Sequence, residues 1–110
     1  MDKKDAMIIA SKYADEVMIK YDTVKIVLFG SYAKGNFNED SDIDIAVILK
    51  DYDNLVETQV DLMRIRRKID SRIEPHPIRE QDFNASNPLV NEIIRYGENV
   101  ERHNQTAKPN

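Results

Sequence analysis

Residues 24–49 read VKIVLFGSYAKGNFNEDSDIDIAVIL, and this stretch decides the fold. Its two ends are nearly continuous apolar runs rich in β-branched residues, which is typical of buried strands. We therefore predict strands at 24–29 and 43–49. Residues 30–41, between them, are polar and irregular, with a short helical turn expected near Tyr32.

Amphipathic helices are predicted on both sides of this stretch. Residues 3–21 carry apolar side chains at the three- and four-residue spacing of one helix face. These side chains are Met7, Ala10, Ala14, Val17, Met18 and Tyr21. A second helix is expected to run from a cap at Asp53 or Asn54 to about Ile69. Its apolar face would carry Leu55, Leu62, Ile65 and Ile69.

Two further elements complete the order. Residues 72–78 predict a short third strand, and its prolines favour an edge position because proline has no N–H donor. Asn87-Pro88 begins a last helix, which ends at Gly97. The sequence thus predicts an α/β fold in which a small mixed β-sheet packs against helices. We expect one domain over residues 1–101 and a flexible polar tail over 102–110.

The composition excludes several classes of protein. A net charge of −4 argues against a broad basic face for nucleic acid, so no direct nucleic-acid partner is expected. The chain has no cysteine, which excludes disulfides and thiolate metal sites. It also has no signal-peptide pattern and no apolar run near the roughly 20 residues that span a bilayer. We expect a soluble, cytoplasmic protein with no membrane partner.

Two of the three glycines lie in the loop between the predicted strands, at Gly30 and Gly35. A glycine directly after a buried strand lets the backbone approach a ligand closely, and phosphate is the usual ligand. The common phosphate motifs do not fit: Asn36 stands where the Walker pattern needs lysine, and the dinucleotide fingerprint lacks its third glycine. A calcium loop fails as well, because Ile45 replaces its required glycine.

Two carboxylates follow at the start of the second strand. Alternation sends Asp42 and Asp44 to the same face, with Cα atoms about 6.6 Å apart. Two such carboxylates can hold one or two Mg²⁺ ions, which prefer oxygen ligands and keep substrate phosphates in their coordination shell. The amides of Gly30 and Ser31, with the Ser31 hydroxyl, would hold the phosphates. The loop therefore predicts a metal–triphosphate site.

The arrangement Gly30-Ser31, ten residues, then Asp42-x-Asp44 resembles the signature of the polymerase-β-type nucleotidyltransferase superfamily. The whole chain is similar to its shortest members, the minimal nucleotidyltransferases of bacteria and archaea. The resemblance is dense over residues 24–49 and extends in element order over about residues 3–100. It implies a polymerase-β-like nucleotidyltransferase core.

The resemblance also implies roles for individual residues. Asp42 and Asp44 would be catalytic magnesium ligands, and Gly30 with Ser31 would bind the triphosphate of the nucleotide. Members of the family often have a third carboxylate, either a further metal ligand or a base for the acceptor hydroxyl. Glu74 matches it best, on the side of the third strand that also carries His76, with Asp70 as the alternative. Lys34 stands where the family often has arginine, which keeps the charge for nucleotide binding but loses bidentate geometry.

The function implied is Mg²⁺-dependent transfer of AMP from ATP, with pyrophosphate leaving. Because the core uses essentially the whole chain, another molecule would supply the acceptor. Minimal nucleotidyltransferases are commonly antitoxins that adenylylate a tyrosine of a small helical HEPN-type toxin, with which they form hetero-oligomers. Two alternatives stay open: an antitoxin that neutralises its partner by binding alone, and a transferase for small molecules such as aminoglycosides.

Overall fold

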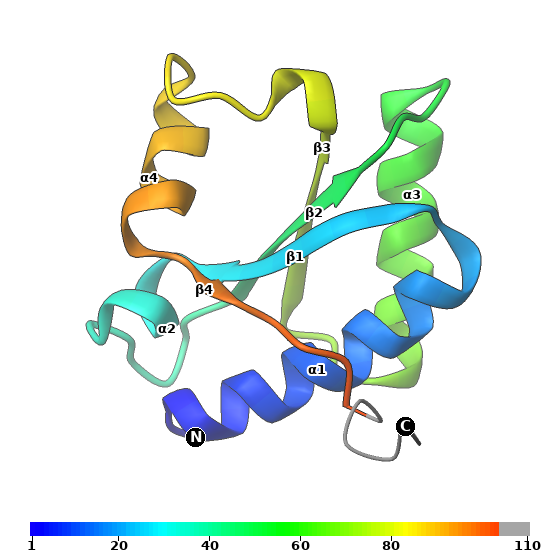
Figure 1. Ribbon diagram of the computed structural model, residues 1–110. Coiled ribbons are helices and arrows are strands. Elements are labelled where there is room, and N and C mark those ends of the chain that lie inside the picture. Colours follow the sequence, from blue (N-terminus) through cyan, green and yellow to red (C-terminus); the bar gives the residue numbers. More distant parts are fainter. Residues whose placement is uncertain (104–110) are drawn as a thin grey trace, which may run out of the picture.

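The computed structural model describes residues 1–103 and folds them as an α/β domain (Figure 1). The predicted elements are present with small shifts at their ends. The helices are α1 (Lys3–Lys20), α2 (Ser31–Lys34), α3 (Leu55–Ile65) and α4 (Pro88–Tyr96), with the 3₁₀ turns η1 (Arg66–Lys68) and η2 (Glu80–Asp82). The strands are β1 (Thr23–Phe29), β2 (Ile43–Leu49), β3 (Ile73–Arg79) and β4 (Glu98–Asn99).

The sheet is mixed, as predicted, with the strand order β3-β2-β1-β4. β1 runs antiparallel to β2 and to β4, and β3 runs parallel to β2. β3 lies at an edge, where the missing N–H groups of Pro75 and Pro77 break no ladder in the interior of the sheet. The sequence did not reveal β4, because two residues are too short for a periodic pattern.

Helices cover both faces of this sheet (Figure 1). Side chains of β2 at alternate positions pack on one face with α1 and α3, and they include Ile45 and Val47. The intervening Ala46 and Ile48 pack on the other face with Val90 of α4. Burial on both faces explains why β2 is a continuous apolar run instead of an alternating one.

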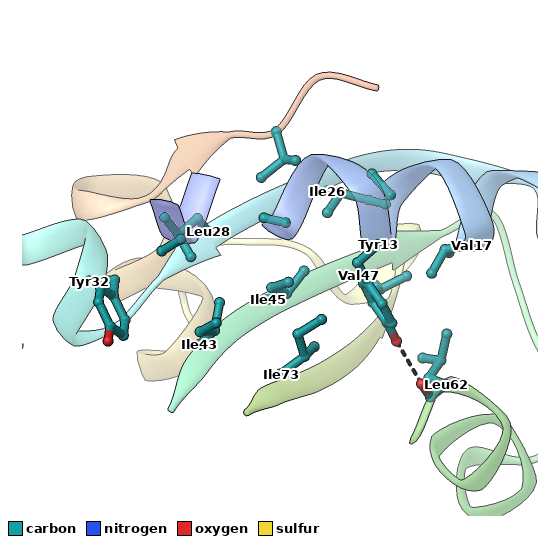
Figure 2. Packing of buried hydrophobic residues seen from close by; sticks show 14 of the residues in the cluster. Tyr13, Val17, Ile26, Leu28, Tyr32, Ile43, Ile45, Val47, Leu62 and Ile73 are labelled. Atoms are coloured by element: carbon teal, nitrogen blue, oxygen red, sulfur yellow. Dashed lines mark hydrogen bonds between the residues drawn. The ribbon is translucent and has the colours of Figure 1, made fainter. Parts of the chain in front are cut away.

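The apolar core on the α1 face contains a buried hydrogen bond between two of its helices (Figure 2). The hydroxyl of Tyr13, which is fully buried, donates to the Leu62 carbonyl oxygen at 2.8 Å. This bond links α1 to α3, which pack side by side on the same face of the sheet. It also satisfies the phenol, which would otherwise be costly to bury.

Two tyrosines on this side make the stability of the fold sensitive to alkaline pH. Burial raises the pKa of Tyr13 far above its ordinary value. Burial and a hydrogen bond to Asp61 raise the pKa of Tyr21 to about 12. Because both pKa values are higher in the folded state than in the unfolded state, the neutral phenols stabilise the fold fully below about pH 10. We predict that the free energy of unfolding falls as the pH rises from about 10 towards 12.

Denaturant titrations over this range would check the prediction, with a Tyr21→Phe variant as the comparison. The variant should lose part of the pH dependence because it carries one ionisable phenol fewer. A free energy of unfolding that stays constant up to about pH 12 would contradict the assignment.

One predicted core residue is not in the core. Leu55 was expected on the buried face of α3, but its side chain is 54% exposed, whereas Thr58 and Leu62 are buried. Leu55 is the first residue of the helix, directly after the N-cap Asn54, and there it lines a surface cleft with Pro77 and Leu89. The helix also ends at Ile65 and continues only as η1.

Near the C-terminus, Val100 is buried in the core on the α1 face. The Arg102 side chain and the His103 amide both reach the carboxylate of Asp15 on α1. The rest of the predicted tail, residues 104–110, lies outside the described residues. Across residues 1–103, no helix is both long and apolar enough to cross a membrane.

Candidate active site

The loop after β1 brings its first glycine against a carboxylate. Gly30 has a φ of 74°, which strongly favours glycine, and it caps the short helix α2. Because Phe29 pairs with Asp44 in the antiparallel ladder, Gly30 lies directly beside the Asp44 side chain. A Cβ at Gly30 would lie closer to Asp44 Oδ2 than the 3.0 Å that Cβ atoms keep from other atoms. The structure therefore joins the phosphate-loop candidate and the metal-ligand candidate in one place.

Asp44 lies at the centre of a polar cluster on the α4 face of the sheet. The parallel register pairs it with Glu74, and pairs Ala46 with His76, so Glu74 and His76 point to the same face as Asp44. His76 Nε2 lies 3.1 Å from Asp44 Oδ1, and both side chains are about 30% exposed. The predicted parity of Glu74 and His76 is confirmed, since Ile73 is buried on the opposite face.

Asp42 precedes β2 by one residue and is exposed. Among residues 1–103, no three His, Asp or Glu side chains are close enough together to hold a metal ion by themselves. The donor set nevertheless suits Mg²⁺, which proteins usually bind through one or two carboxylates while substrate phosphates and water complete its shell. Asp42 and Asp44 are the residues that would hold the ion.

The two candidates for a third carboxylate have different surroundings. Asp70 accepts two hydrogen bonds from the Arg72 side chain, at 2.9 and 2.6 Å, and these bonds lower the pKa of Asp70. Its carboxylate is therefore already engaged. Glu74 has no such partner among the described residues and is adjacent to Asp44 in register. The geometry favours Glu74 over Asp70.

Comparison with known proteins assigns this arrangement to a family. Residues 10–97 match the nucleotidyltransferase domain family. The chain belongs to the nucleotidyltransferases. The predicted family and enzyme class are thereby confirmed, and the matched region includes all the site residues predicted above.

Three known proteins illustrate the similarity. "Putative protein adenylyltransferase MJ0141" of Methanocaldococcus jannaschii is 33% identical over 79 residues, which are 69% of this chain and 77% of that protein. A crystal structure of a toxin–antitoxin with AMP-PNP aligns with a TM-score of 0.62 and 21% identity, covering 86% of this chain and 74% of that one. A mutant of the toxin–antitoxin MntA-HpeT aligns with a TM-score of 0.60 and 16% identity, covering 96% and 77%. The two structural similarities support the fold.

Lys34, the predicted nucleotide-binding lysine, contacts α4 in this nucleotidyltransferase. Its Nζ lies 3.3 Å from Glu92 Oε1 and 5.5 Å from the centre of the Tyr96 ring. These contacts link α2, directly after the glycine turn, to the helix that covers the site face. Because the ion pair is partly exposed, it contributes at most about 1 kcal/mol to stability. Lys34 can therefore exchange it for a phosphate at little cost.

Two surface clefts of this nucleotidyltransferase lie outside the predicted site residues. Each has a volume of about 430 Å³. One is lined by Met1, Tyr32, the loop after α2 and Arg72, and the other by the end of β3 and residues near the starts of α3 and α4. Neither contains Gly30, Asp42 or Asp44.

Sequence reasoning missed two features of the site. It did not find the edge-on contact between the Phe29 and His76 rings, whose centres are 4.9 Å apart. An aromatic residue at the end of a strand is the only signal of that contact. It also missed the ion pair of Lys34 with Glu92, since 58 residues separate the two and no periodicity connects them.

Proposed function

We propose that this nucleotidyltransferase uses Mg²⁺ to transfer AMP from ATP to a tyrosine hydroxyl of a helical HEPN-type toxin, and that it acts in the cytoplasm as the antitoxin. Gly30, Ser31 and Lys34 bind the triphosphate. Asp42 and Asp44 hold the metal, and Glu74 serves as a third oxygen ligand or as the base. The observation that carries the proposal is the contact of Gly30 with the Asp44 carboxylate in a chain of this family.

The chemistry requires few groups from the chain. The acceptor oxygen attacks the α-phosphorus of ATP, the bond from that phosphorus to the bridging oxygen breaks, and pyrophosphate leaves. Bound Mg²⁺ would neutralise the charge on the phosphates. The backbone amides after Gly30 orient the triphosphate, and the hydroxyl proton passes to Glu74 or to water. Catalysis of phosphoryl transfer consists mostly of positioning and charge neutralisation, which these groups can supply.

The nature of the acceptor is supported by two observations. Asp42 is exposed and Asp44 is partly exposed, so a macromolecule can bring its own surface to these carboxylates. The similar protein of M. jannaschii is named for protein adenylylation, and the two structures described above are of a toxin–antitoxin, one of them with the ATP analogue AMP-PNP. Together these favour ATP as donor and a toxin protein as acceptor.

A labelling experiment tests the proposal. The chain is incubated with Mg²⁺, the toxin encoded beside it, and ATP labelled at either the α- or the γ-phosphate. Label is expected on the toxin from α-labelled ATP only, and digestion should locate it on a tyrosine. An Asp42→Asn/Asp44→Asn variant is the control and should give no label. If this variant still neutralises the toxin as well as the wild type does, the chain is instead an antitoxin that acts by contact.

Replacing Glu74 by Gln is predicted to reduce the transfer rate, whereas Asp70→Asn is predicted to leave it nearly unchanged. Loss of a catalytic base typically costs about 10²–10⁴-fold in rate. The Asp70 carboxylate is engaged by Arg72 and takes no part in the proposed chemistry. Initial rates of label transfer at saturating ATP measure the difference. Equal rates for the two variants would show that Glu74 takes no part in the transfer.

A further inference from the structure

The Asp44 carboxylate is held from two sides. Its Oδ1 lies 3.1 Å from His76 Nε2, while its Oδ2 is the atom nearest to where a Cβ of Gly30 would be. One oxygen is thus occupied by the imidazole, and the other faces the glycine turn. Resting on the proposed function, in which Asp44 binds the metal, we infer that His76 is a positioning residue that keeps Asp44 Oδ2 turned towards the phosphate loop.

The direction of the hydrogen bond follows from the chemistry of the pair. An ionised carboxylate can only accept, so His76 Nε2 must carry the proton and donate to Oδ1. The imidazole then fixes the torsion of the Asp44 side chain, which would otherwise rotate freely on its partly exposed face of the sheet. Among residues 1–103, no hydrogen bond is donated to Oδ2, so its lone pairs are available to a metal ion.

The ring of His76 is itself fixed in place. It stands on β3 two residues after Glu74, and the parallel register places it beside Ala46, the next residue of β2 on the Asp44 face. The edge-on contact with Phe29, at an interplanar angle of 67°, holds the plane of the imidazole. The position of His76 on β3, its neighbour Ala46 on β2 and its contact with Phe29 on β1 therefore determine where the Nε2 atom points.

Such an arrangement has a function only if the Asp44 carboxylate must be oriented before the metal ion binds. Groups that hydrogen-bond to a metal ligand fix its geometry, and removing them typically costs about 10–100-fold in metal affinity. The Gly30 backbone cannot fix the orientation of Asp44 alone, because it makes only a packing contact with Oδ2 and donates no hydrogen bond to it. His76 supplies the directional contact, without being a ligand or touching the nucleotide.

Titration with Mn²⁺ alone, followed by electron paramagnetic resonance of the free ion, tests this role. The His76→Ala variant should bind Mn²⁺ about 10–100-fold more weakly than the wild type. His76→Gln should recover most of the affinity, because its amide NH₂ can donate from a similar position. His103→Ala, which removes the other imidazole of the chain, should bind like the wild type.

A spectroscopic signature accompanies the titration. In ¹⁵N-labelled protein without metal, the His76 ring should be protonated at Nε2, and Asp44→Asn should shift that resonance. Thermal unfolding checks that each variant is folded. If His76→Ala does not fold, His76→Phe, which keeps an aromatic ring but has no donor, decides: a folded Phe variant with weak affinity that His76→Gln recovers supports the role, and one with affinity near the wild type overturns it.

The outcomes separate this inference from the proposed function. If Asp44→Asn weakens Mn²⁺ binding but His76→Ala does not, Asp44 is a ligand and the positioning role of His76 is wrong. If Asp44→Asn binds Mn²⁺ as tightly as the wild type, the metal site itself is misplaced and both fail. A His76 ring protonated at Nδ1 alone would also overturn the inference, since Nε2 could then not donate.

Discussion

Asp44→Asn is expected to lower the rate of AMP transfer by about 10²–10³-fold while the protein stays folded. A metal held by this carboxylate stabilises the charge of the transition state by several kcal/mol, and each 1.36 kcal/mol corresponds to a tenfold change in rate. Asparagine has nearly the same shape but no charge, and the side chain is only partly buried, so the cost to folding should be small. Rates of label transfer from α-labelled ATP to the proposed toxin partner measure the effect.

A neighbouring acid provides the matched control for this prediction. Asp40 is an exposed residue of the loop that precedes β2, and Asp40→Asn removes the same charge without changing a proposed metal ligand. It should retain most of the activity. Comparable losses for the two variants would mean that the loop acts through its overall charge and not through a specific carboxylate.

Gly30→Ala is expected to abolish most of the transfer activity and also to destabilise the fold. A non-glycine residue at the φ of 74° costs about 1–2 kcal/mol, and the new Cβ would collide with Asp44 Oδ2. The carboxylate would have to turn away from the phosphate loop, so the site would lose its metal ligand and its phosphate grip together. Chemical denaturation measures the stability, and label transfer measures the activity.

Gly35→Ala separates the two effects. Gly35 also has a positive φ, 86°, but a Cβ there would meet nothing within 4 Å. Gly35→Ala should therefore lose only the free energy that its positive φ costs, whereas Gly30→Ala should lose more stability and should also lose transfer out of proportion to its stability. If Gly35→Ala loses as much activity as Gly30→Ala, the cause is loop strain and not the contact with Asp44.

Much of the fold follows from local patterns. The apolar runs at 24–29 and 43–49 became β1 and β2 nearly residue for residue, and Asn87-Pro88 with Gly97 marked the ends of α4. These signals are short-range: burial on both faces needs continuous apolar residues, and helix ends need particular caps. The pairing of Asp44 with Glu74 was not predictable in this way, because it depends on the parallel register of strands 30 residues apart.

The parts that sequence reasoning missed are all set by tertiary contacts. The exposure of Leu55 depends on its place at the start of α3, and β4 exists because residues 98–99 pair with β1. The ion pair of Lys34 with Glu92 depends on α4 covering the site face. Within the site, Gly30 and Asp44 were predicted to act together, whereas their direct contact needed the antiparallel register of β1 and β2.

The most direct test of a joint metal–nucleotide site at Gly30-Ser31 and Asp42/Asp44 is thermal unfolding with ATP, GTP, CTP or UTP, each with and without Mg²⁺. A ligand at 100 times its dissociation constant stabilises the native state by about 2.7 kcal/mol, which raises the melting temperature of a domain this size by several degrees. The account predicts such a shift with ATP only when Mg²⁺ is present, and none in the Asp42→Asn/Asp44→Asn variant. A shift of equal size in that variant, or no shift for the wild type either alone or in complex with the proposed toxin partner, would contradict it.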